Sequence, residues 1–217
     1  MLLAVPAFAS AAGDLGWTSS PKLYEIRTLT GKSEWGSVNG QASAATFFHP
    51  RSVAVLPDGK LLIADHNNHL IRMLTSNQVV TFSGLTIGED EAGMPIGAFH
   101  DDNRTLAAFE LPAGMAVDAN GNIYVADMGN HSIRKITPDG RVTTLAGNGL
   151  IGSVDGVGSE ARFAYPSDVA VDAEGNVYVA DTLNHVIRKI TPDGKVTTLT
   201  APSTRVVEYH PGAVEPA

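Results

Sequence analysis

Three segments of this chain repeat one another, and this internal repetition constrains the fold more than any other feature of the sequence. Residues 122–146 and 176–200 match at 19 of 25 positions, and residues 60–83 form a more divergent third copy. In each copy an Asp ends an apolar run, an Arg follows seven positions later, and a Pro precedes the Asp by fifteen positions. The landmarks are Pro50, Asp65 and Arg72, then Pro112, Asp127 and Arg134, then Pro166, Asp181 and Arg188. Three copies of one small structural unit are therefore expected.

Each unit has the pattern of four short strands and no helical period. In the third unit the strands are expected at 168–172, 176–181, 185–191 and 195–200, with the turn tripeptide Pro192-Asp193-Gly194 before the last. Such a sheet has two apolar faces and cannot bury both alone, so the copies must pack face to face around an axis. The predicted fold class is all-β: a β-propeller of four-stranded antiparallel blades, with three full blades in this chain in a partial or open arrangement.

The units are expected at about 50–84, 112–147 and 166–200, inside a propeller region at 23–200. The connections share a G…DG…A-x-F-x-x-P pattern, as at 152–166, and its Ala161 and Phe163 are expected to fill the gap between neighbouring blades. One connection is longer than the others, because Gly84 to Pro112 spans 28 positions against 19 from Gly147 to Pro166. Loops that lengthen on a rigid scaffold often carry recognition, so residues 86–108 are the first candidate for a binding element.

The repeated units resemble the NHL-repeat family, whose name is spelled by Asn68-His69-Leu70. The matching triplets start at Asn130 and Asn184, and the Tyr-Val-Ala-Asp strand end and the Ile-Arg-Lys-Ile strand look like that family too. The resemblance implies a propeller of about six blades whose top face or axial channel binds a partner. Members include RNA- or protein-binding modules of ligases, extracellular domains of bacterial sensor kinases and a few lyases. This chain departs from them because it holds three full blades, whereas a closed propeller needs at least about four.

Two interpretations of that departure follow. Residues 24–30 resemble the final strand of a unit and could close a ring by joining the last blade, while residues 201–217 look like the start of a further connection or a truncated tail, so the first interpretation is a truncated or partial chain. The alternative is self-association of two copies through their open blade edges, because an open propeller end exposes an apolar face.

Composition narrows the functional classes. A formal charge of -8 and a pI near 5.2 disfavour nucleic-acid partners. Cysteine is absent, which removes disulfides, thiolate chemistry and Cys-based zinc sites. Residues 2–9 are apolar and end in Ala7-Phe8-Ala9, a small-x-small triplet typical of signal-peptide cleavage. Residues 1–12 are therefore read as a signal peptide or an apolar tail, and the protein as extracellular or at the cell surface. No segment is apolar for long enough to span a membrane.

The repeated polar residues are interpreted as structural wiring, because a device that recurs in every repeat is more often structural than catalytic. A buried Arg134 would need a carboxylate, which Asp127 or an Asp of the adjacent blade could supply. Asn130 and His131 would fix the hairpin by bonding backbone groups. The full set is Asp65, Asn68, His69, Arg72, Asp127, Asn130, His131, Arg134, Asp181, Asn184, His185 and Arg188.

The candidate binding residues lie in the long connection: Asp90, Glu91, His100, Asp101 and Asp102, near Glu89 and Asn103. A calcium site in this connection is disfavoured, because its carboxylates lack the regular spacing of oxygen ligands that calcium-binding loops use. The unrepeated histidines His49, His66, His100 and His210 could bind a metal on the axis, but they show no ligand spacing. No cofactor, no metal and no catalytic residue is predicted.

Three functions are weighed on these grounds, of which RNA binding, as in some members of the family that the chain resembles, is disfavoured by the acidic charge. The first is an exported, non-enzymatic propeller that binds a protein or carbohydrate ligand of unknown identity. The alternative is a propeller lyase or hydrolase with a metal held on the axis, which would need at least three ligands from different blades.

Overall fold

The computed structural model describes residues 27–199, and its strands form three antiparallel sheets. Blade 1 has the order β1-β5-β4-β3-β2, blade 2 the order β6-β7-β8-β9, and blade 3 the order β10-β14-β13-β12-β11. The strands of blade 1 are β1 (Gly40–Gln41), β2 (Pro50–Val55), β3 (Leu61–Asp65), β4 (Leu70–Leu74) and β5 (Gln78–Ser83). Those of blade 2 are β6 (Pro112–Val117), β7 (Ile123–Asp127), β8 (Ser132–Ile136) and β9 (Val142–Ala146). Those of blade 3 are β10 (Gly156–Val157), β11 (Pro166–Val171), β12 (Val177–Asp181), β13 (Val186–Ile190) and β14 (Lys195–Thr198).

The four consecutive strands of each blade come from the repeated sequence pattern. The second strand is the most buried, since all five residues of β7 are buried, as its apolar sequence requires. A short 3-10 turn follows in blades 1 and 3, at His66–Asn68 and Thr182–Asn184. The turn before the last strand of blade 2 places Gly140 at φ +89, a conformation that glycine adopts without strain.

Two blades carry a fifth, two-residue strand that the four-strand prediction lacks. β1 and β10 come from the connection that precedes each blade and pair with the outermost strands β5 and β14. In blade 2 the corresponding segment makes only the isolated bridge between Asn103 and Arg141. The connection therefore wraps around the outer edge of its own blade before it enters the innermost strand.

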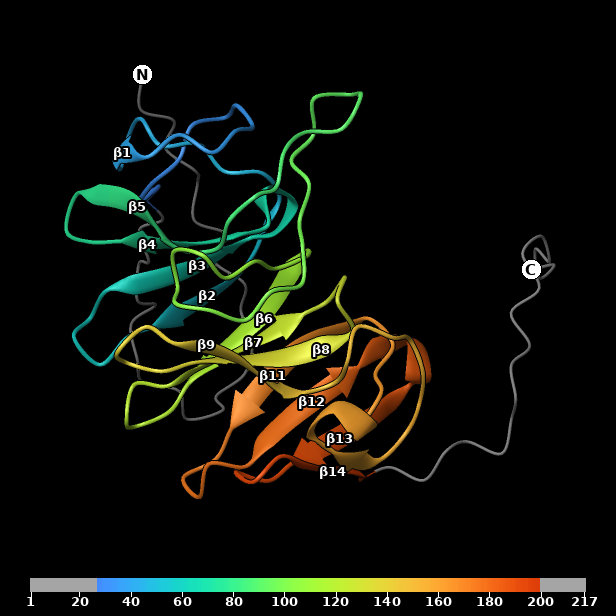
Figure 1. The fold of residues 1–217 in the computed structure, drawn as a ribbon. Coiled ribbons are helices and arrows are strands. Elements are labelled where there is room, and N and C mark those ends of the chain that lie inside the picture. Colours follow the sequence, from blue (N-terminus) through green and yellow to red (C-terminus); the bar gives the residue numbers. More distant parts are fainter. Residues whose placement is uncertain (1–26, 200–217) are drawn as a thin grey trace, which may run out of the picture.

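Blade 2 lies between blades 1 and 3, and its two faces are covered by different apolar clusters (Figure 1). Phe109 is fully buried among Leu62 and Ile71 of blade 1 and Val125 of blade 2. Phe163 is fully buried in the same way between blades 2 and 3. The all-β propeller prediction is thus confirmed, and the connection Phe fills the gap between blades as expected.

The predicted closing strand at 24–30 is not found in the part that the structure describes. Residues 27–30 form no strand, and the Thr30 hydroxyl donates to the Ala42 carbonyl of the connection that leads into blade 1. Residues 24–26, together with the predicted segments 1–12 and 201–217 and His210, lie outside the described residues. Between residues 27 and 199 no helix has the length and apolar character needed to cross a bilayer.

Candidate functional site

A buried arginine organises each blade, and its guanidinium is fully enclosed in all three. In blade 2, Nη1 of Arg134 donates to Asp127 Oδ2 at 2.6 Å and to the Ala108 carbonyl at 2.9 Å. Nη2 donates to Asp101 Oδ1 at 2.6 Å and to the His100 carbonyl at 2.7 Å. The guanidinium also lies over the Phe109 ring, 5.0 Å from its centre. The arginine therefore ties the strands to the connection that precedes them.

The same arrangement recurs in the other two blades. Arg72 donates to Asp65 Oδ2 at 2.7 Å and to Asn39 Oδ1 at 2.8 Å. Arg188 donates to Asp181 Oδ2 at 2.9 Å and to Asp155 Oδ1 at 2.7 Å. The carboxylate that the sequence suggested as partner thus comes from the same blade, seven residues earlier. A second acceptor side chain, at Asn39, Asp101 or Asp155, was not foreseen. The G…DG pattern marks its position in blade 3, at Asp155-Gly156, but blade 2 has Asp101-Asp102 there.

The repeated Asp and Asn complete this network. The other carboxylate oxygen of Asp127 accepts from the Glu110 backbone N–H at 2.7 Å, and Asn130 Nδ2 donates to both Asp127 and the Ala98 carbonyl. Equivalent bonds hold Asp65 with Asn68 and Asp181 with Asn184. Burial raises the pKa of Asp65 and Asp127, although the hydrogen bonds and the neighbouring arginine oppose that shift. The repeated Asp and Asn side chains are therefore hydrogen-bonded to one another and to backbone groups.

The repeated histidine acts between blades, not within the hairpin that the sequence suggested. His69 Nδ1 accepts from the Leu111 backbone N–H at 3.0 Å, and His131 Nδ1 accepts from the Tyr165 N–H at 3.2 Å. Leu111 and Tyr165 each precede the first proline of the next blade and have φ near +50. Burial lowers the pKa of both His69 and His131, which favours the neutral ring that this bond requires. His185, the equivalent histidine of blade 3, is exposed.

The extra length of the long connection lies in residues 85–97, which overlap the first part of the segment 86–108 that the sequence nominated as a binding element. Asn68, Asn130 and Asn184 donate to carbonyls that are each 32 positions earlier, at Gly36, Ala98 and Gly152. From those carbonyls onward the three connections have equal length. His100, Asp101 and Asp102 therefore belong to the connection that every blade has.

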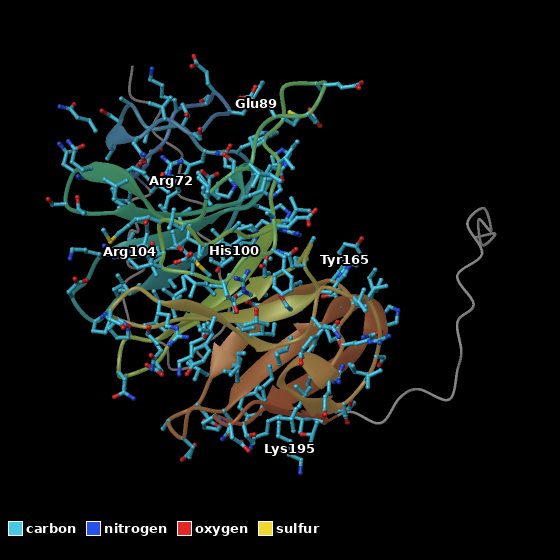
Figure 2. All side chains as sticks on the ribbon, in the orientation of Figure 1. Arg72, Glu89, His100, Arg104, Tyr165 and Lys195 are labelled. Atoms are coloured by element: carbon cyan, nitrogen blue, oxygen red, sulfur yellow. The ribbon has the colours of Figure 1, made fainter. Side chains whose placement is uncertain are left out.

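Residues 85–97 form a hairpin that stands away from the sheets, with Glu89 near its tip (Figure 2). Its two sides are joined by bonds from Ile87 N to Ile96 O at 3.0 Å and from Ile96 N to Gly88 O at 2.9 Å. The tip is a tight turn in which Asp90 Oδ1 accepts from the Ala92 and Met94 backbone N–H groups. His69 Nε2 lies 3.0 Å from the carbonyl of Pro95, the residue that pairs with Glu89 across the hairpin, and so holds the returning side of the hairpin to blade 1.

The five residues nominated for binding do not form one cluster. Asp90 caps the hairpin turn, Glu91 is exposed beside it, and Asp101 is taken up by Arg134 and Thr144. His100 Nε2 and Asp102 Oδ2 are 3.5 Å apart on the surface. Among residues 27–199 no group of three or more His, Cys, Asp or Glu side chains is placed to hold a metal ion.

Comparison with known proteins gives one family match and several distant relatives. The family model described as NHL repeat matches residues 47–73, 109–136 and 163–190. The chain is 33% identical to the chloroplastic protein SUPPRESSOR OF QUENCHING 1 of Arabidopsis thaliana over 76% of this chain and 16% of that protein. It is 34% identical to a probable peptidyl-alpha-hydroxyglycine alpha-amidating lyase of Caenorhabditis elegans over 34% of this chain and 20% of that protein.

Among solved structures, the model resembles an auxiliary nutrient binding protein from Bacteroides thetaiotaomicron, with a TM-score of 0.56 and 25% identity. That match covers 72% of this chain and 39% of the other. The chain thus spans less than half the length of each of these three proteins.

Proposed function

Because this chain belongs to the NHL-repeat family, whose fold serves unrelated activities, we propose that it is a non-enzymatic binding scaffold whose ligand-contacting element is the hairpin at residues 85–97. The observation that carries the proposal is the contrast between the two sets of polar groups. The repeated Asp, Asn and Arg side chains are engaged within the blades, whereas the hairpin occurs in one connection only and presents its side chains to solvent.

The exposed surface of the hairpin suits a protein ligand better than a carbohydrate. Ile87 is 64% exposed and Ile96 38%, while Leu85 is also exposed at the base. Covering apolar groups of this kind with a partner stabilises the complex. The acidic tip at Glu89, Asp90 and Glu91 would favour a partner with positive charge at that point. The solved structure of an auxiliary nutrient binding protein supports a binding role for an architecture of this kind.

The test is a binding comparison that uses matched pairs of exposed residues. The wild-type chain and the variant Ile87→Ser/Ile96→Ser would be immobilised and exposed to extracts of the source cell envelope, and captured proteins would be fixed by chemical cross-linking. Both proteins would also be applied to a carbohydrate array. The control is Leu150→Ser/Ile151→Ser, which removes two exposed apolar side chains from the connection of blade 3. A ligand kept by the control and bound at least tenfold more weakly by the hairpin variant is expected. Equal binding by all three proteins would contradict the assignment.

Export is proposed from the apolar segment at residues 2–9 and the Ala7-Phe8-Ala9 triplet. Amino-terminal sequencing of the protein recovered from its native cells tests it. The expected sequence begins at or shortly after Ser10. Recovery from the cytoplasmic fraction with residues 1–9 intact would contradict export.

The alternative of a lyase or hydrolase has one point of support, because one relative carries the name of a lyase. No arrangement of side chains among residues 27–199 favours it. Elemental analysis of the purified chain separates the two functions, since stoichiometric zinc or calcium would count for the metal-dependent alternative.

A further inference from the structure

The outer edge of blade 2 departs from the repeat just after the hairpin at residues 85–97. Counted from the carbonyls that Asn68, Asn130 and Asn184 bond, the positions of the three connections correspond one to one. Three of the four positions 99–102 carry an aromatic ring, an imidazole and a carboxylate where both other blades have serine, valine and glycine. These three are Phe99, His100 and Asp102, which correspond to Ser37, Val38 and Gly40 in blade 1 and to Ser153, Val154 and Gly156 in blade 3. Side chains that recur hold the blades together, so side chains that break the repeat are candidates for function.

The residues that break the repeat line two adjoining hollows on this edge. The first has a volume of about 590 Å³ and lies between Phe99, on the connection that enters blade 2, and Asn148, on the connection that leaves it. The second, of about 520 Å³, begins at Asp101, which lines both, and extends along Asp102. Each volume is within the range of about 300–1,000 Å³ that small-ligand sites occupy. Both blades that flank blade 2 are among the described residues, so this edge is seen with its neighbours in place.

The Phe99 ring is held in place by the protein and still exposed to solvent over 41% of its residue surface. The guanidinium of Arg134 lies over it, 5.0 Å from the ring centre, and lies equally close to the buried ring of Phe109. Gly149 passes the edge of the Phe99 ring, and a Cβ at that glycine would lie 3.4 Å from the ring atom Cδ1. A ring supported in this way offers a fixed apolar surface to a ligand in the first hollow.

The polar groups around the ring keep capacity for further hydrogen bonds. Asn148 Nδ2 donates to the Ser159 carbonyl at 2.9 Å, and Asn148 Oδ1 accepts from the Leu150 backbone N–H at 3.1 Å. The carboxamide is therefore fixed, with one N–H and one lone pair left. The His100 ring (Figure 2) has Asp102 Oδ2, at 3.5 Å, as its one polar partner among residues 27–199. An oriented amide, an imidazole and a carboxylate thus surround one exposed aromatic ring.

From this arrangement we propose that the first hollow binds one ring of a neutral carbohydrate, and that the second hollow takes the sugar unit next to it. A pyranose has an apolar face of C–H groups, which packs on Phe99, and a rim of hydroxyls, which can donate to Asp102 and both donate to and accept from Asn148. The cation behind the ring, Arg134, is already paired with Asp127 and Asp101, so an acidic ligand gains no free positive charge there. This site is separate from the hairpin and does not rest on the proposed function.

The test applies the full chain to an array of immobilised neutral and acidic oligosaccharides, followed by calorimetric titration with the free oligosaccharide that gives the strongest signal. Phe99→Ser and Asp102→Gly give blade 2 the residues that blades 1 and 3 carry, so the fold should tolerate them, and each is checked for a cooperative urea transition. Each is expected to bind about tenfold more weakly than the wild type, which corresponds to about 1.4 kcal/mol. Phe99→Tyr keeps the ring and should bind as the wild type does. Val154→Ser is the matched control, because Val154 is the exposed counterpart of His100 in blade 3.

The hairpin variant Ile87→Ser/Ile96→Ser separates this proposal from the proposed function. It should keep the affinity of the wild type for the oligosaccharide, whatever happens to its capture of envelope proteins. If it still captures those proteins while sugar binding depends on Phe99, the hairpin assignment fails and the carbohydrate site stands. No saturable binding of any oligosaccharide at millimolar concentration, a preference for acidic sugars, or equal affinity of the wild type and Phe99→Ser would overturn the carbohydrate site.

Discussion

The Nδ1 atom of His69 accepts a hydrogen bond from the backbone N–H of Leu111, 42 residues later, at 3.0 Å. A backbone N–H can only donate, so Nδ1 carries no proton, and Nε2 must hold the proton that it donates to the Pro95 carbonyl. One neutral imidazole therefore joins blade 1 both to the residue that precedes the first strand of blade 2 and to the returning side of the hairpin. His131 and Tyr165 repeat the first of these contacts between blades 2 and 3.

Replacing His131 by Ala should destabilise the chain by about 1–2 kcal/mol, because the Tyr165 N–H loses its acceptor in a partly buried site. Urea unfolding at pH 8 measures this difference. Ser167→Ala serves as a control on the same edge of blade 3, because the Ser167 hydroxyl is hydrogen-bonded to the exposed Thr182 hydroxyl and not to a backbone group of another blade. A smaller effect for His131→Ala than for this control would contradict the role given to the histidine.

The contribution of His131 should depend on pH. Burial lowers its folded-state pKa below the ordinary 6.5, with Glu110 and Asp181 opposing the shift. The unfolded chain therefore binds more protons between the two pKa values, so the stability that the neutral ring supplies is complete above pH 6.5. That stability is lost as the pH falls from 6.5 through the lowered value.

The measurement is the free energy of unfolding of wild type and His131→Ala between pH 8 and pH 4.5. Burial raises the pKa of Asp65 and Asp127, which gives these groups the opposite slope. Their contributions cancel in the difference between the two proteins. The difference should shrink as the solution becomes more acidic, and a constant difference would show that protonation of His131 is not coupled to folding.

Removing the buried arginine of blade 2 should be among the most damaging single changes. Arg134→Ala leaves Asp127 buried without its cation, and a cost of about 3–5 kcal/mol is expected. Asp127→Asn/Arg134→Met should cost less than the sum of its single changes, because no uncompensated charge remains. A double-mutant cycle in urea measures the coupling, and additive effects would contradict the network.

The connection phenylalanines should differ according to whether a blade covers them. Phe163→Ala removes a ring fully enclosed between blades 2 and 3 and should cost about 3–5 kcal/mol. Phe47→Ala changes the same position on blade 1, where the ring is half-buried, and should cost less. Equal losses for the two variants would show that the enclosure of the ring does not decide its contribution.

A close approach between blades 2 and 3 should make Gly114 intolerant of any side chain. A Cβ at Gly114 would overlap both the Oδ1 atom and the Cα atom of Asp168. Gly114→Ala is therefore expected to cost about 1–3 kcal/mol through overpacking. Asp168→Ala should recover only part of the loss, because the backbone contact remains. Full recovery would place the clash in the side chain alone.

Several features of this protein could be predicted because they are local or repeated. Each of these features involves residues that are close together in the sequence. Examples are the individual strands, the turn at Pro192-Asp193-Gly194 and the ion pair between Asp127 and Arg134. The pattern of apolar residues and turn residues carries that information directly. The interblade position of Phe163 could be inferred as well, because the same connection pattern precedes each blade.

What the tertiary structure alone decided depends on contacts between residues that are distant in sequence. The sequence suggested that His131 bonds its own hairpin, but the ring meets Tyr165 of the next blade. It also placed Asp101 in a binding loop, whereas Arg134 lies 33 residues later and takes up that carboxylate. Identical residues on blades 2 and 3 became core in one blade and surface in the other. Burial is a property of what packs against a face, and a repeat by itself does not specify its neighbour.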